Sequence, residues 1–260
     1  MIRVEEIHKS FGSEHVLKGI STVFEQGKTN LIIGQSGSGK TVFLKCLLGL
    51  FDTDAGKIIY ENKAIQEMNR DEKGDLRKQI GMLFQGGALF DSMNIEENVM
   101  FPLRMFTQQS KSEMLDRVNF VLQRVNLENV NQKYPSEISG GMQKRVAIAR
   151  AIVNHPKYLF CDEPNSGLDP KTATVIDNLI HEITQEYNIT TVVNTHDMNS
   201  VMEIGDTIVL LKKGHLVWRG DKTQIFKTDN KDVVDFVYSS DLFKKIREVQ
   251  LKEDIDNLGN

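Results

Sequence analysis

Short runs of apolar and mostly β-branched residues recur along the chain and predict buried strands. Runs of this kind occur at Thr29–Ile33, Lys57–Tyr60, Ile80–Phe84, Tyr158–Cys161, Ile189–Val193 and Thr207–Leu211. Several are apolar at consecutive positions, which is typical of strands that are covered on both faces. Because helical patterns separate many of the runs, the sequence predicts an α/β fold with a largely parallel sheet.

The middle of the chain, from about residue 86 to residue 153, has a different pattern. Ser110 and Glu113 match a helix capping box. Apolar residues after this box share one helical face, namely Leu115, Val118, Leu122 and Val125. We therefore expect a mainly helical subdomain over about 86–153, inserted into an α/β body formed by 1–85 and 154–220.

Composition narrows the class of protein without indicating a chemistry. The chain has 260 residues, of which 40% are hydrophobic and 26% charged, so one compact globular unit is expected. The net charge of -4 does not favour binding of nucleic acid or of an anionic membrane by the protein as a whole. Any site for phosphate must therefore be a local cluster of donors. No internal repeat is visible.

Location follows from the cysteines and from the apolar segments. Cys46 and Cys161 lie in apolar surroundings without metal-ligand spacing, which predicts small buried side chains in a reducing compartment. The start of the chain alternates charged and apolar residues, like a strand and unlike a secretory signal, so we expect a cytoplasmic protein. The most apolar segment, Val42–Phe51, is far shorter than the roughly 20 residues that cross a bilayer. The charged extension at 221–260 indicates little, except that 253–260 is expected to fray.

The residues after the first of the apolar runs match the pattern G-x-x-x-x-G-K-[ST] between a strand and a helix. They are Gly34, Gln35, Ser36, Gly37, Ser38, Gly39, Lys40 and Thr41, with Val42 next in the helix. The glycines let the backbone fold around an anion, so that N–H groups and the helix start point at phosphates. Lys40 can then reach the β- and γ-phosphates, and the Thr41 hydroxyl can ligate Mg²⁺. The alternative is a flexible turn with an exposed lysine. The sequence thus predicts a site for ATP and Mg²⁺.

Two acidic residues follow a second apolar strand. Asp162 is expected to hold the metal and Glu163 to polarise the attacking water, because adjacent residues at a strand end can diverge. Taken alone, Asp-Glu-Pro after a strand is more often a turn. The phosphate loop earlier in the chain favours the catalytic interpretation.

The segment Ser139, Gly140, Gly141 and Met142 resembles the signature motif of ABC transporter ATPases. Ser139 is a candidate helix N-cap, and the helix start forms a second anion-binding terminus. The resemblance implies that this segment closes over the γ-phosphate held by a second copy, with two ATP molecules between the protomers of a homodimer. The alternative is an ordinary helix start followed by solvated basic residues. Met142 stands where glutamine is commoner, and we still expect hydrolysis because the helix terminus remains.

Further residues match this family over about 1–220. Phe11 resembles the aromatic that stacks on adenine, and Gln85 the glutamine that senses Mg²⁺ and the attacking water. Asp169 matches the segment that reaches across the dimer, and His196 the switch histidine that contacts the γ-phosphate. Each residue alone has a structural interpretation. The resemblance implies a P-loop ATPase of the ABC type: a mixed, largely parallel sheet, an antiparallel β part and a helical subdomain.

A narrower resemblance points to the ATPases of Mla/Mce lipid-transport systems. It rests on Gln85–Phe90 with the residues up to Pro102, on Met142 and on Thr195–Val201. It implies phospholipid transport between membranes, with a Mla-type permease and a Mce-domain lipid-binding protein as partners, on the cytoplasmic face of the inner membrane. No nucleic-acid partner is expected. Another ABC importer or exporter, or a soluble cluster-assembly ATPase, is the alternative.

The same stretch predicts a groove for a cytoplasmic helix of the permease. Phe90, Met93 and Phe101 offer apolar and adaptable contacts, edged by Asp91 and Glu97. Burial of the apolar residues in the core of the monomer is the alternative.

Overall fold

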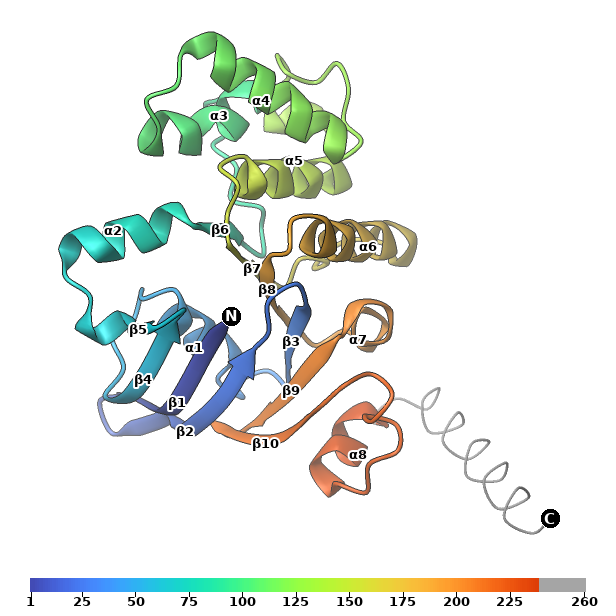
Figure 1. Cartoon of the computed structure of the whole chain (residues 1–260). Coiled ribbons are helices and arrows are strands. Elements are labelled where there is room, and N and C mark those ends of the chain that lie inside the picture. Colours follow the sequence, from blue (N-terminus) through green and yellow to red (C-terminus); the bar gives the residue numbers. More distant parts are fainter. Residues whose placement is uncertain (239–260) are drawn as a thin grey trace.

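The computed structural model describes residues 1–238 (Figure 1). The expected fraying at 253–260 lies outside the described residues. The strands form one sheet of six and one of four.

The larger sheet is parallel except at one edge, as the consecutive apolar runs predict. Its order is β10 (His215–Gly220), β9 (Thr207–Lys212), β3 (Thr29–Ile33), β8 (Thr190–Thr195), β7 (Tyr158–Asp162) and β6 (Ile80–Leu83). Only β10 pairs antiparallel, with β9. Every residue of β3 and β8 is buried, which explains why these strands show no alternation.

The smaller sheet is antiparallel and lies below and to the left in Figure 1. Its order is β2 (Glu14–Phe24), β1 (Ile2–Phe11), β4 (Ala55–Tyr60) and β5 (Lys63–Ala64). Side chains of α1 (Lys40–Leu47), including Phe43 and Leu47, share a core with both sheets. This core fixes the start of α1 against the end of β3.

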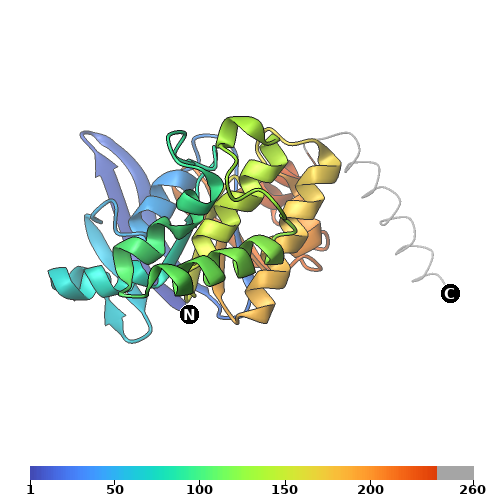
Figure 2. The same cartoon turned by 90° about the horizontal axis from the view of Figure 1, so that it is seen from above.

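The helical region begins after β6 and stands above the larger sheet (Figures 1 and 2). It contains α3 (Ile95–Phe106), α4 (Lys111–Arg124) and α5 (Gly140–Ile152). The capping box of Ser110 and Glu113 is confirmed at the start of α4. Val118, Leu122 and Val125 are buried, as the helical pattern predicts, and Leu115 packs partly buried against the same core.

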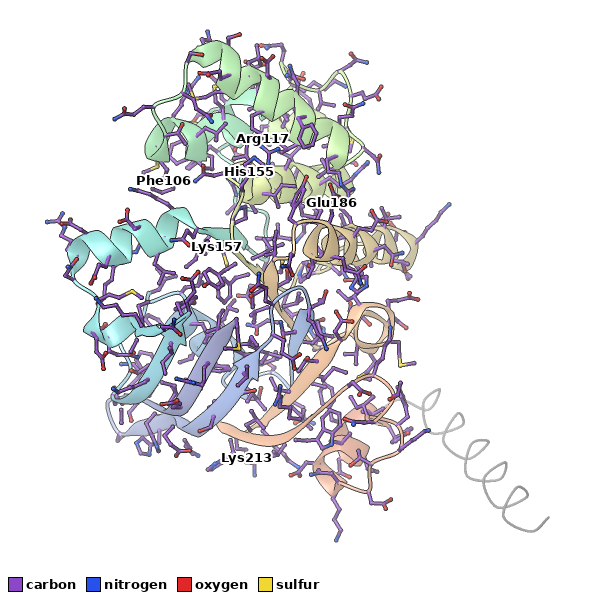
Figure 3. All side chains as sticks on the ribbon, viewed as in Figure 1. Phe106, Arg117, His155, Lys157, Glu186 and Lys213 are labelled. Atoms are coloured by element: carbon purple, nitrogen blue, oxygen red, sulfur yellow. The ribbon has the colours of Figure 1, made fainter. Side chains whose placement is uncertain are left out.

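Polar contacts join this helical region to α6 (Pro170–Glu186). Arg124 Nε donates to Glu186 Oε2 at 2.7 Å, and Arg124 Nη2 donates to Glu182 Oε2 at 3.3 Å. Figure 3 labels Glu186 at this boundary. We retain the division into an α/β body, a helical subdomain and an extension as a proposal.

The remaining helices pack around the edges of the sheets. They are α2 (Arg70–Lys78), α7 (Met198–Ile204) and α8 (Lys231–Val237), with 3-10 turns at Ile65–Glu67 and Pro135–Glu137. Val233 and Val237 of α8 belong to the main core, so the extension is packed at least this far. Both cysteines are buried, as expected. No helix within residues 1–238 combines the length and apolarity needed to cross a bilayer.

Candidate functional site

The loop Gly34–Thr41 connects β3 to α1, which confirms the predicted strand–loop–helix context. Gly34, Gly37 and Gly39 have φ values of 151°, 76° and 104°, a region that favours glycine. A Cβ on Gly34 would lie 2.3 Å from Leu211 O, so this position has no room for a side chain. The loop thus ends at a helix start whose free N–H groups can bind an anion.

Lys40 is 8% exposed, and its side chain folds back over this loop. Its ammonium donates to Gly34 O at 2.7 Å and to Gln35 O at 3.3 Å. Burial lowers the pKa of Lys40, against the attraction of the carboxylates of Glu163 and Asp162. Phosphate oxygens can replace the neutral carbonyl partners with stronger, charge-assisted ones.

The two acidic residues diverge at the end of β7. Glu163 has a φ of 48°, a left-handed conformation that is rare for a residue with a Cβ and often marks functional sites. Asp162 Oδ1 accepts from Asn194 Nδ2 at 3.1 Å, whereas Glu163 Oε2 lies 2.9 Å from His196 Nδ1. The predicted divergence is therefore present. The metal, base and switch roles of these residues stay predictions.

Glu163 and His196 lie on the wall of a cavity of about 460 Å³, which Ser166, Thr195 and Asn199 also line. The His196 side chain is 69% exposed, and that of Glu163 is 17% exposed. Water can therefore reach the carboxylate, while the imidazole is free to contact a ligand at the surface.

The residues expected to hold Mg²⁺ follow three parallel strands. Thr41 lies in α1 after β3, Gln85 follows β6 and Asp162 ends β7. The carboxyl ends of parallel strands meet at one edge of a sheet. A hydroxyl, an amide and a carboxylate are hard donors that suit Mg²⁺. Within residues 1–238 no three His, Cys, Asp or Glu side chains gather as a metal cluster. Protein-bound Mg²⁺ commonly takes phosphate oxygens among its ligands.

Gln85 is joined to the segment expected to reach across the dimer. Its Nε2 donates to Ser166 Oγ at 3.2 Å. Asp169, further along that segment, caps α6, because its Oδ1 accepts from Thr172 N at 3.1 Å. The cap gives Asp169 a structural role, and its contact with a second copy stays a prediction.

Ser139 is the N-cap of α5, which confirms the helix start predicted there. Its Oγ accepts from Met142 N at 3.3 Å, and a Cβ on Gly141 would lie 2.7 Å from a methyl group of Thr172. In the described part of the chain, no hydrogen bond or ion pair joins this helix start to the loop of Lys40. The contact of this helix start with a phosphate held by a second copy stays a prediction.

Phe11 ends β1, and the residue is 44% exposed. The ring packs edge-on against Phe51, with 5.3 Å between centroids, and Lys9 Nζ lies 5.2 Å from its centre. Stacking on adenine stays a prediction.

A side chain that orients Asp162 was not predicted from the sequence. Asn194 of β8 is 0% exposed and donates to that carboxylate. Asn194 stands among valines and threonines at the end of a strand predicted to be buried, and a buried amide of this kind needs a hydrogen-bond partner; this could have indicated its role. The alternative of an ordinary helix start followed by solvated basic residues does not hold for Lys144, which is 6% exposed.

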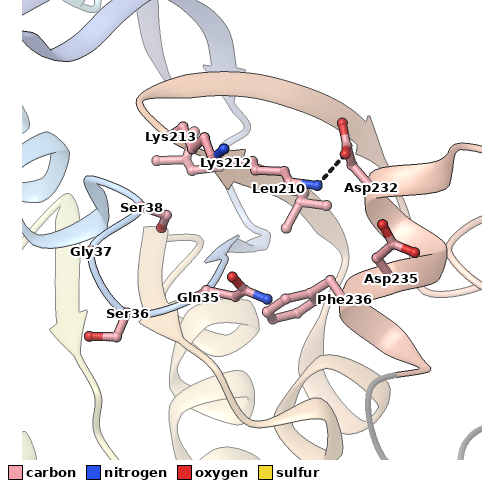
Figure 4. A pocket seen from close by; sticks show the side chains of 11 residues that line it. Gln35, Ser36, Gly37, Ser38, Leu210, Lys212, Lys213, Asp232, Asp235 and Phe236 are labelled. Atoms are coloured by element: carbon pink, nitrogen blue, oxygen red, sulfur yellow. Dashed lines mark hydrogen bonds and ion pairs between the residues drawn. The ribbon is translucent and has the colours of Figure 1, made fainter.

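A further cavity, of about 230 Å³, separates the phosphate loop from α8 (Figure 4). Lys212 of β9 pairs with Asp232 of α8, and the Gln35 side chain points towards the Phe236 ring. The extension thus contributes a helix beside the phosphate loop, which its weak periodicity did not predict.

An apolar cavity of about 400 Å³ lies between β6, α3 and α5. Phe90 and Phe101 line it, as expected, together with Phe84, Met105 and Phe106. Met93, Asp91 and Glu97 do not line it. The Glu97 carboxylate instead accepts from Asn94 N at 3.1 Å, as part of the N-terminal capping box of α3.

Comparison with known proteins agrees with this geometry. The model of the ABC transporter family matches residues 17–166. A probable ribonucleotide transport ATP-binding protein, mkl of Mycobacterium leprae, is 39% identical over 91% of this chain and 68% of its own length. The methionine import ATP-binding protein MetN of Clostridium tetani is 41% identical over 87% of this chain and 71% of its own length. The chain thus spans only part of these relatives.

Solved structures show the same fold. MJ0796, a bacterial ABC transporter cassette in a dimeric structure, has a TM-score of 0.78 at 30% identity, covering 85% of this chain and 99% of that one. A dimer of MJ0796 in a post-hydrolysis state with ADP and Pi has a TM-score of 0.77. Structure cbiO1 from Clostridium perfringens, part of the transporter complex cbiONQ, has a TM-score of 0.81 at 30% identity, covering 96% of this chain and 98% of that one.

Proposed function

This chain belongs to the ABC transporter family as an ATP-binding, ATP-hydrolysing subunit, and we propose that its transporter moves phospholipids between membranes. The observation that supports hydrolysis best is the Glu163–His196 pair at the strand edge that also carries Asp162. The lipid cargo rests on the resemblance of Gln85–Phe90 and Met142 to Mla/Mce ATPases.

In this proposal Lys40 and the loop N–H groups bind the triphosphate, and Phe11 stacks on adenine. Thr41, Gln85 and Asp162 would hold Mg²⁺, which neutralises charge on the β- and γ-phosphates. Glu163 polarises the attacking water and His196 contacts the γ-phosphate.

A homodimer provides the rest of each site. Ser139 and Gly141 of the partner subunit close over the γ-phosphate, and the Asp169 segment reaches across the interface. Because γ-phosphate binds better to the closed dimer, ATP shifts the population towards closure, and hydrolysis releases it.

The permease partner would dock at the apolar cavity beside Gln85. Phe84, Phe90 and Met105 are 44%, 41% and 60% exposed, a density of apolar side chains that suits a helix of a membrane subunit. We propose a Mla-type permease there, with a Mce-domain protein in the same complex and the ATPase on the cytoplasmic face of the inner membrane.

A second candidate is an importer of another solute. The names of the relatives favour it, since they specify ribonucleotide transport and methionine import.

Purification of the intact membrane complex decides between these cargoes. We expect a Mce-domain protein and bound phospholipid to co-purify with the complex. We also expect the complex to transfer lipid between vesicles in an ATP-dependent manner. A solute-binding protein in place of the Mce-domain protein, with no lipid transfer, would support the importer and exclude lipid cargo.

A further inference from the structure

Two cations of α5 hold the turn that follows β6. Lys144 Nζ donates to the carbonyl oxygen of Gln85. Arg150 Nη2 donates to Gly87 O at 2.7 Å, and its Nη1 donates to Ala88 O at 2.8 Å. One helix therefore binds three main-chain carbonyls of one turn.

The burial of these two cations indicates that they need their hydrogen bonds to the turn. Lys144 is 6% exposed, and burial lowers the pKa of both Lys144 and Arg150. A buried ammonium is costly unless it is hydrogen-bonded, and an apolar side chain of similar length would fill the same space at lower cost. Packing alone does not explain a lysine at this position.

The backbone of the turn needs such support. Gly87 and Ala88 have φ values of 75° and 47°. Consecutive left-handed residues are unfavourable when one of them carries a Cβ, and they persist where the surroundings fix them. The guanidinium of Arg150 is a rigid fork that bonds the carbonyls of both residues.

The other end of the segment is held by α3. Asn98 is 0% exposed, and its Nδ2 donates to Phe90 O at 3.1 Å and to Met93 O at 3.0 Å. Its Oδ1 accepts from Phe90 N at 2.8 Å. Side chains of α3 and α5 thus hold the segment after β6 to the helical region.

We propose that Lys144 and Arg150 are positioning residues that fix the Gln85–Ala88 turn to α5. The Gln85 main chain, and the Phe90 ring that lies 5.9 Å from the Arg150 guanidinium, then move together with the helix that begins at Ser139. Closure at Ser139 therefore reaches the apolar groove through one rigid unit. This coupling rests on the function proposed above, whereas the attachment of the turn to α5 is a property of the chain alone.

Three variants of the full-length chain test the attachment. Lys144→Met keeps the length of the side chain and removes the donor, and Lys144→Gln restores a neutral donor. Arg145→Met is the matched control, because Arg145 lies on the same helix but donates to Asn126 O at 2.8 Å. The measurements are hydrogen–deuterium exchange of residues 86–91 and the kcat and KM for ATP.

In Lys144→Met we expect exchange at 86–91 to accelerate and kcat to fall, each about ten-fold, because one bond to a charged donor is lost. KM should change less than about two-fold, since the phosphate loop is not touched. Lys144→Gln should recover most of both losses, and Arg145→Met should behave like the unchanged chain.

Unchanged protection of 86–91 in Lys144→Met overturns the attachment. A joint change of kcat, KM and melting temperature without rescue by Lys144→Gln overturns the positioning role. If Lys144→Met does not fold, Arg150→Lys replaces it as the test, because lysine keeps the charge but lacks the two-pronged guanidinium. Normal exchange of residues 88–89 in Arg150→Lys contradicts the proposal. If the chain without any substitution has no ATPase activity, the proposed function is refuted. The hydrogen–deuterium exchange of residues 86–91 still decides whether the turn is attached to α5.

Discussion

His196 Nδ1 lies 2.9 Å from Glu163 Oε2, although the two residues follow different strands. Parallel pairing of β7 with β8 sets Asp162 opposite Asn194, so Glu163, one residue further along, and His196, two residues further along, emerge at the same edge of the sheet. The register of the sheet therefore creates the pair.

The Glu163→Gln variant should lose turnover and keep ATP. The amide preserves the shape of the side chain but cannot accept a proton from water, so we expect kcat to fall at least about 100-fold. Phosphate release and nucleotide binding measure the two effects. Glu61→Gln is the control, because Glu61 is 59% exposed and pairs with Lys157 at the surface. Unchanged hydrolysis would disprove the role of Glu163.

Lys40→Met should weaken ATP binding at least about ten-fold, because a charge-assisted contact to phosphate is lost. Titration with a fluorescent nucleotide measures it. Lys45→Met, on the exposed side of the same helix, should bind ATP normally. Equal affinities in both variants would contradict the phosphate-binding role.

Mixing two inactive variants should restore activity if sites are shared between protomers. Lys40→Met and Ser139→Ala each damage both sites of a homodimer. In the mixed dimer, the intact Lys40 of one protomer meets the intact Ser139 of its partner, so one complete site remains. Steady-state hydrolysis should rise above that of either variant alone. No recovery despite dimerisation would exclude shared sites.

Asp177 should make the chain less stable as pH rises. Burial raises its pKa from 3.8 to about 6. The folded state then binds more protons than the unfolded state between these values, so stability falls as pH rises through this window. The shift corresponds to about 3 kcal/mol, fully present above pH 6.

The Asp177→Asn variant should remove this penalty. Urea unfolding should show a gain of up to about 3 kcal/mol at pH 7.5 that disappears towards pH 4. Asp75→Asn serves as the control, because the Asp75 side chain is 68% exposed. A gain of equal size at both pH values would show that titration of Asp177 is not the cause.

Met105→Glu should separate the chain from its permease. A charge at this position, which is 60% exposed, would have to be desolvated in the apolar groove. Co-purification with the membrane subunit should be lost at an unchanged melting temperature. Phe120→Glu, 50% exposed on α4 away from the groove, should retain the partner. Loss of the partner in both variants would locate the interface elsewhere.

The sequence by itself determined the local features. The phosphate loop could be identified because a strand, three glycines and Lys40 act within a few residues, and the capping box of Ser110 because a helix start is a local signal. The parallel sheet followed from apolar runs that do not alternate.

Only the tertiary structure decided which distant residues meet. Strand register brought Glu163 to His196, helix packing buried Lys144 against the Gln85 carbonyl, and α8 came to lie beside the phosphate loop. The prediction that Glu97 edges the groove is wrong, because its carboxylate caps α3. A sequence pattern does not distinguish a carboxylate that caps a helix from one at the rim of a groove. Such contacts depend on how whole elements pack, and the periodicity of a single segment does not encode the partner it will meet.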